Sequence, residues 1–232
     1  MKKERIALID ALRGLAVALM VVHHALFDAV EFLGAPAWLF SNPVFDVLHY
    51  IFAGVFVALA GVSSRFSRSN IRRGILTALA AAAVSAATSR VGIPVHFGVL
   101  HLLASCMLLY GLTQKALDRV PDAVNAVVCL VLLVFSAFAV KYIALDSRFL
   151  WPLGWTPLDF YSADYFPLFP WLFVFLLGTL AGVPIKDRRL PDRFYEIKPP
   201  ILPAIGRKSL IIYLLHQPVL YGAALAARHL RG

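Results

Sequence analysis

Residues 6–29 read IALIDALRGLAVALMVVHHALFDA, and this stretch decides the fold. A helix needs about 20 apolar residues to cross the ~30 Å hydrocarbon core of a bilayer, and this stretch is long enough. It nevertheless carries Asp10, Arg13, His24 and Asp28. At about 100° per residue, these four side chains fall within about 60° of one another on a helix. The stretch therefore predicts a membrane helix whose one polar face looks into a polar interior.

The composition of the whole chain supports lipid as its solvent. Of 232 residues, 60% are hydrophobic and only 15% are charged. Soluble domains are typically ~45–50% apolar and ~25% charged. Disorder is excluded as well, because disordered chains combine low hydrophobicity with high charge. The two cysteines, Cys106 and Cys129, lie in apolar runs and give no disulfide framework.

Seven segments are long and apolar enough to cross a membrane: 6–29, 44–63, 72–91, 97–116, 123–142, 166–185 and 208–228. Loop-forming residues lie between them, such as Gly34-Ala35-Pro36 and the proline-rich run at 199–203. Lipid cannot satisfy backbone polar groups, so each span must be helical. The sequence predicts a single all-α domain over residues 1–232, a polytopic transmembrane bundle of about seven spans.

The basic residues predict the orientation of the bundle. If the N-terminus is cytoplasmic, sixteen of the 22 lysines and arginines lie on the cytoplasmic side and five lie outside. Lys2 and Lys3 belong to the cytoplasmic group, and Arg13 lies within the first span. Cytoplasmic loops carry the excess of basic residues in membrane proteins. We therefore expect a cytoplasmic N-terminus, an external C-terminus and no cleaved signal peptide. The net charge of +9 then reflects membrane topology, and no nucleic-acid partner is expected.

Histidines are the candidate catalytic residues. His24 and Asp28 are i,i+4 neighbours, and a carboxylate beside an imidazole makes it a better general base. In the predicted topology His101 and His216 lie at overlapping depth in other spans, as does His49. A structural hydrogen-bonded pair is the alternative for His24 and Asp28. A metal site across helices also stays open, although no zinc-type spacing is present and no metal is expected.

Four arginines are candidates for binding an anionic ligand. Arg72 and Arg73 open the third span, and Arg207 precedes the seventh. Basic residues at a helix N-terminus bind phosphate readily, although topology and lipid headgroups also explain them. Arg13 lies too deep to reach the membrane surface, so it needs an anionic partner, which is either Asp10 or a ligand.

The long loop at 143–165 is rich in aromatic residues, including Trp151, Trp155, Phe160, Tyr161 and Tyr165. An interfacial aromatic belt is one interpretation. A lid or a surface that stacks on sugar rings is the other, because flat aromatic faces suit pyranose rings. The sequence leaves both interpretations open.

An ordered set of motifs runs along the chain: IDALRGLA at 9–16, HALFD at 24–28, AGVS at 60–63, FGVLH at 97–101, YFPLFPW at 165–171 and GRKSLIIYLLHQP at 206–218. The set resembles the bacterial branch of the heparan-α-glucosaminide N-acetyltransferase catalytic-domain family. The resemblance implies an enzyme of the bacterial inner membrane, an acetyl-CoA-dependent acyltransferase. Such an enzyme passes the acyl group from cytosolic acyl-CoA to an amine or hydroxyl of a glycan or other acceptor outside. Its partners would be acyl-CoA, the acceptor, lipid and possible further copies of the chain.

The resemblance leads to a provisional set of roles. His24 would be the base, oriented by Asp28, with His101 and His216 lining the acceptor pocket. Arg13, Arg72, Arg73 and Arg207 would hold the anionic groups of the donor. The family's catalytic histidine follows the first span, but residues 32–45 contain none, so His24 or His49 takes its place. A proton-coupled transporter and a non-catalytic scaffold are the alternatives, the first because intramembrane Asp, Arg and His residues also suit proton transport.

Overall fold

The computed structural model describes residues 5–145 and 147–231, so Lys2 and Lys3 of the charge count lie outside the described residues. Within these ranges the chain is helical and contains no strand beyond a single bridge between Phe97 and Tyr165. The predicted all-α architecture is confirmed. The elements are α1 (Ala7–Leu33), η1 (Ala37–Leu39), α2 (Pro43–Arg65), α3 (Asn70–Arg90), α4 (Val99–Leu117), α5 (Asp122–Tyr142), α6 (Leu168–Lys186), α7 (Asp192–Glu196), α8 (Leu202–Arg207) and α9 (Ser209–Arg231).

Six of the described segments are long and apolar enough to cross a membrane, namely α1, η1 with α2, α3, α5, α6 and α9. They confirm a polytopic membrane protein. The fourth predicted span, α4, is not among them, because its 19 residues include His101, Gln114 and Lys115. Many of its side chains are buried, and a helix covered by its neighbours needs fewer apolar residues than one that faces lipid. A seventh span at α4 stays a prediction.

The helix ends follow local sequence signals. Helix α1 continues to Leu33, four residues beyond the predicted 29, and ends at Gly34. Gly34 adopts the left-handed conformation (φ 70°), which glycine tolerates best, and its N–H donates to the carbonyl of Ala29. Helix α3 begins after Ser69, whose side chain accepts a hydrogen bond from the backbone N–H of Arg72 at 3.2 Å.

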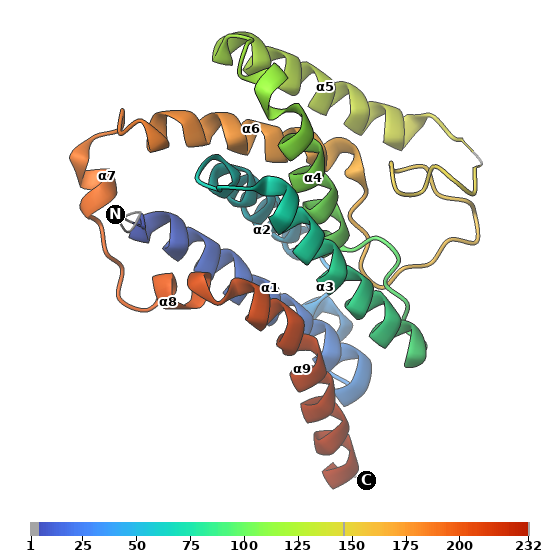
Figure 1. Ribbon diagram of the computed structural model, residues 1–232. Coiled ribbons are helices and arrows are strands. Elements are labelled where there is room, and N and C mark those ends of the chain that lie inside the picture. The colour runs from blue at the N-terminus through green and yellow to red at the C-terminus, as the bar shows by residue number, and fades with distance from the viewer. Residues whose placement is uncertain (1–4, 146, 232) are drawn as a thin grey trace. The chain divides into compact units, whose positions relative to one another are not determined.

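The chain divides into two compact units. The terminal unit contains the described residues up to Leu59 and those from Leu190 onward; the central unit is Ala60–Arg189. In the terminal unit, α8 and α9 pack along α1 (Figure 1). The α1–α8 crossing is tight. A Cβ on Gly14 would collide with the carbonyl oxygen of Leu202, and one on Gly206 would collide with that of Asp10. The prediction of one domain over residues 1–232 stays a prediction.

Alanine at this crossing is expected to destabilise the protein. Gly14→Ala or Gly206→Ala forces the two helix backbones apart, and overpacking of this kind costs about 1–3 kcal/mol. The melting temperature in detergent should fall by about 5 °C. Gly222→Ala on α9 is the matched control, because a Cβ there meets nothing within 4 Å. An unchanged melting temperature for both crossing variants would contradict the close approach.

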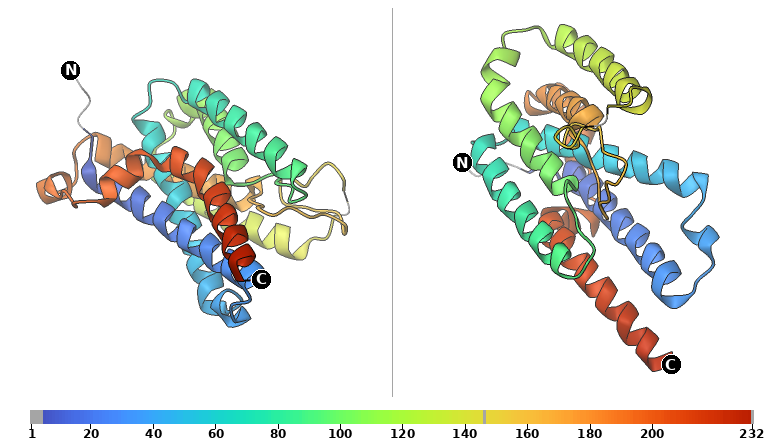
Figure 2. Two further views of the ribbon diagram at one scale, coloured as in Figure 1. Left: turned by 90° about the horizontal axis from the view of Figure 1, so that it is seen from below. Right: turned by 90° about the vertical axis from the view of Figure 1, so that its right-hand side faces the viewer.

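In the central unit, α3 packs against α4, and α6 packs against both α4 and α5 (Figure 2). The loop before α6 is tied to the start of α4, where Asp164 Oδ2 accepts from the backbone N–H of Val99 at 3.1 Å. The Tyr165 hydroxyl donates to the carbonyl of Trp151 at 2.6 Å, and burial raises the pKa of Tyr165 to about 12. Hydrogen bonds therefore hold this loop against the start of α4.

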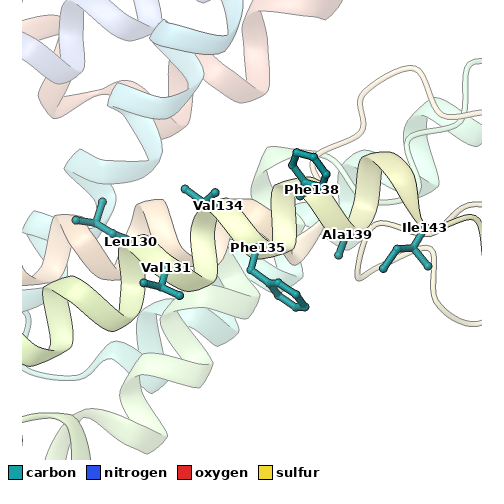
Figure 3. Close-up of a pocket in the computed structure, with 7 residues that line it drawn as sticks. All are labelled: Leu130, Val131, Val134, Phe135, Phe138, Ala139 and Ile143. Atoms are coloured by element: carbon teal, nitrogen blue, oxygen red, sulfur yellow. The ribbon is translucent and has the colours of Figure 1, made fainter.

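Helix α5 carries a shallow groove of about 630 Å³ lined by Leu130, Val131, Val134, Phe135, Phe138, Ala139 and Ile143 (Figure 3). All seven lining side chains are apolar, and Phe135 and Phe138 are exposed. A groove with no polar group offers neither an acid, a base nor an anion-binding residue. It is an apolar surface of the kind that faces lipid, and the candidate site lies elsewhere.

Candidate functional site

His24 on α1 and His216 on α9 are brought together in the terminal unit. Their ring centroids lie 4.9 Å apart at an angle of 54°. His216 Nδ1 lies 2.7 Å from the carbonyl oxygen of Tyr213. Since a carbonyl only accepts, Nδ1 must carry the proton, and Nε2 is left with the lone pair. Nε2 is buried and has no hydrogen-bond partner among the described residues. It is therefore available as a base.

Asp28 lies in the same cluster but does not pair with His24. Its carboxylate is buried and accepts hydrogen bonds from Gln217 Nε2 at 3.2 and 3.5 Å. Within residues 5–145 and 147–231 no hydrogen bond joins Asp28 to His24. The predicted hydrogen bond between Asp28 and His24 is therefore not observed. The Asp28 carboxylate is bonded to the Gln217 amide instead. Gln217 was given no role from sequence, and its place beside His216 was the only signal.

His23 and His49 extend the cluster along a neighbouring face of α1. The His23 ring lies 4.3 Å from that of His49 on α2 and 4.9 Å from that of Phe40. His23 also contacts His24 edge-on, with 5.7 Å between ring centroids. At 100° per residue His23 lies off the helix face shared by Asp10, Arg13, His24 and Asp28. The contacts agree, since His23 meets Phe40 and His49 while His24 meets His216. His49, the alternative to His24 for the catalytic histidine, thus pairs with His23, a residue for which the sequence predicts no role.

At the other end of α1, the expected ion pair is confirmed. Arg13 Nη1 donates to Asp10 Oδ1 at 3.0 Å, and both side chains are largely buried. The second oxygen of Asp10 is buried and has no partner in the described part of the chain. Arg207 is exposed at the end of α8, next to the Gly14–Gly206 crossing. The crossing thus brings the backbones of Asp10 and Gly206 together, and Arg13 and Arg207 are the sequence neighbours of its two glycines.

The remaining predicted residues lie in the central unit. His101 Nε2 lies 3.2 Å from the hydroxyl of Ser85, which itself donates to the carbonyl of Val95. His101 Nε2 must then donate to Ser85, so the lone pair is on Nδ1, which is buried. Arg73 Nη1 donates to the Ser63 carbonyl at 3.4 Å. Arg72 is exposed at the start of α3.

The aromatic loop residues pack on one another. The Trp151 and Phe160 rings stack at 5.8 Å, and Phe160 meets Tyr165 edge-on at 5.0 Å. His96 contacts both Trp151 and Phe160, and Phe97 stacks on His101 at 5.7 Å. The loop aromatics thus form a cluster beside the start of α4. Neither a membrane belt nor a sugar-binding surface is favoured by these contacts.

No group of three or more His, Cys, Asp or Glu side chains in the described ranges is placed to hold a metal ion. In the cluster around His24 and His216, three buried polar atoms have no hydrogen-bond partner among the described residues, namely His23 Nδ1, His216 Nε2 and Gln217 Oε1. Buried polar atoms are normally paired, so these are groups that a substrate N–H or O–H could satisfy. The cluster is suited to proton transfer to and from an enclosed substrate.

Comparison with protein families gives a match over nearly the whole chain. The family model described as heparan-alpha-glucosaminide N-acetyltransferase, catalytic, matches residues 5–218. Comparisons with curated proteins and with solved structures found no match. The matched range contains the whole His24–His216 cluster and the four arginines, and it does not favour a transporter. The chain therefore belongs to the heparan-alpha-glucosaminide N-acetyltransferase catalytic family, whose members are membrane acyltransferases.

Proposed function

We propose that the chain transfers an acyl group, most simply acetyl, from acyl-CoA to an amine or hydroxyl of a glycan or other acceptor. We place it in the bacterial inner membrane with the N-terminus in the cytoplasm, so that donor and acceptor arrive from opposite sides. The family supports the reaction class. The observation that carries the assignment of the site is the His24–His216 pair, with the lone pair of His216 Nε2 turned into a buried cluster.

The proposed chemistry needs one base and one leaving group. An imidazole of the pair removes a proton from the acceptor nitrogen or oxygen as that atom attacks the thioester carbonyl. The carbon–sulfur bond breaks, and the CoA thiolate leaves and takes up a proton. General-base catalysis of this kind contributes about 10²–10⁴-fold to rate. Asp28 and Gln217 position the pair by joining α1 to α9.

The donor would be held by arginines at the cytoplasmic ends of the spans in the proposed orientation. Arg13 and Arg207 lie at the α1–α8 crossing, and Arg72 and Arg73 open α3. Guanidinium groups bind phosphate through paired, charge-assisted hydrogen bonds, and acyl-CoA carries several phosphates. A role for His101, which lies in the central unit, in the acceptor pocket stays a prediction.

Free thiol release tests the proposal. Purified protein in detergent is incubated with acetyl-CoA and a panel of amino sugars and glycans, and thiol is followed with a chromogenic disulfide. We expect acceptor-dependent release that His216→Ala reduces by about 10²-fold or more. His229→Ala is the matched control, because His229 is an exposed histidine of the same helix. Failure of the wild-type chain to bind CoA at all would contradict the proposal.

A further inference from the structure

Four imidazoles of the terminal unit form a continuous row. Successive ring centroids lie 4.3 Å apart from His49 to His23, 5.7 Å from His23 to His24, and 4.9 Å from His24 to His216. The row joins three helices, α2, α1 and α9. The proposed acyl transfer uses only the His24–His216 end. The proposed transfer gives no role to His23 and His49, which are both half-buried.

The far end of the row leads to an exposed carboxylate. Asp46 lies one helical turn before His49 on α2 and is solvent-exposed. The i,i+3 spacing places the Asp46 carboxylate on the same face of α2 as His49. The row therefore runs from a buried end at His216 to an exposed end at Asp46.

Other titratable groups near the row are few. On α1 the nearest is Asp28, which is engaged by Gln217. Tyr50 on α2 and Tyr213 on α9 make ring contacts with His49 and His216 respectively. On the side of η1, His23 meets only the apolar ring of Phe40. Among these groups the imidazoles are the ones in which one ring nitrogen accepts a proton while the other donates one.

The proposed reaction removes one proton from the acceptor and adds one to the CoA thiolate, and in the proposed orientation these two exchanges take place on opposite sides of the membrane. When an amine attacks the thioester, its N–H bond breaks and the proton passes to an imidazole of the pair. In this proposal the thiolate leaves toward the donor side and takes a proton from water there, so the acceptor's proton stays on the imidazole. The base has to lose this proton before the next turnover, yet His216 Nε2 has no solvent-exposed partner within the described chain.

We propose that His23 and His49 form a proton relay that carries the acceptor's proton from the His24–His216 pair to Asp46 and then to solvent. The inference rests on the proposed acyltransferase function. In each step one imidazole N–H bond breaks as the next forms, with ring rotation or a water molecule bridging rings in contact, and the Asp46 carboxylate accepts the proton last. His23 Nδ1 is buried without a partner, as expected of a group that must accept a proton from a neighbour.

The relay is tested by exchanging His49 for a residue that keeps its size and hydrogen bonding but cannot carry a proton. His49→Gln should lower steady-state acyl transfer by about 10²-fold, in line with the general effect of losing proton transfer. Added imidazole should restore the rate in a concentration-dependent way, because a small diffusible base can replace the missing group. Asp46→Asn, an exposed change that disturbs no packing, should show a smaller loss with the same rescue. His229→Ala should show neither effect.

The possible outcomes separate the relay from the proposed function. Wild-type rates in both His49→Gln and Asp46→Asn would overturn the relay while leaving the acyltransferase function intact. A loss that imidazole does not restore in either variant would show a merely structural role and would also overturn the relay. Absence of turnover in the wild-type protein would overturn the proposed function, and the relay with it.

Discussion

His24→Ala is expected to lower kcat for acyl transfer by about 10²–10⁴-fold, the range associated with the loss of a general base. The ring of His24 contacts His216 on one side and His23 on the other, so its removal also interrupts the row of imidazoles. We expect the KM for acetyl-CoA to change little, because Arg13 lies about three helical turns before His24 on α1 and the other arginines assigned to the donor lie on α3 and α8. The measurement is steady-state thiol release over a range of acetyl-CoA concentrations.

A control separates chemistry from folding in this variant. His24 contacts its neighbours through ring packing and makes no hydrogen bond within the described chain. His24→Ala should therefore remain monodisperse in detergent with a small fall in melting temperature. His229→Ala should keep the full rate. A His24→Ala protein that is folded and fully active would remove His24 from the mechanism.

The second large effect is expected at the buried ion pair. Arg13→Gln leaves the Asp10 carboxylate buried and uncompensated, which typically costs about 3–5 kcal/mol. In a protein of this size that corresponds to a fall in melting temperature of about 10 °C. The double variant Asp10→Asn with Arg13→Gln removes both charges and should recover most of the loss. Melting in detergent, with and without acetyl-CoA, measures both effects.

The double variant also tests the assignment of Arg13 to the donor. If Arg13 binds a donor phosphate, the folded double variant should raise the Kd for acetyl-CoA by about tenfold or more, the effect of one charge-assisted hydrogen bond. If Arg13 only neutralises Asp10, affinity in the double variant returns to that of the wild type. The second result would leave Arg207, Arg72 and Arg73 as the donor-binding residues.

Much of the fold follows from local rules that the sequence displays. The apolar runs, their length and the loop residues between them predict seven helices, and each appears within a few residues of its expected bounds. The i,i+3 spacing of Asp10 and Arg13 predicts their ion pair, which is observed. Helix α1 extends past residue 29 to Leu33, because a helix continues until a residue such as Gly34 ends it.

The site was harder to predict, because its contacts join residues far apart along the chain. Asp28 and Gln217 are separated by 189 positions in the sequence. The helical periodicity of α1 therefore cannot indicate that Gln217 of α9, and not His24, is the hydrogen-bond partner of Asp28. For His24 and His216 the sequence predicts only that the two side chains lie at overlapping depth in the membrane. Periodicity determines which residues share a face of one helix, but not which other helix packs against that face. The tautomer of His216 could not be predicted either, because the proton on Nδ1 depends on a hydrogen bond to the carbonyl of Tyr213.

The central claim is that the His24–His216 pair meets the acyl group of the donor, and an electrophilic donor analogue tests it most directly. Bromoacetyl-CoA places a reactive carbon where the acetyl group would lie, and an imidazole nitrogen displaces the bromide to form a stable carbon–nitrogen bond. Peptide mass spectrometry then identifies the labelled residue, with excess acetyl-CoA as competitor. We predict labelling at His216 or His24 that acetyl-CoA suppresses. Labelling confined to other residues, or labelling that acetyl-CoA does not suppress, would contradict the claim.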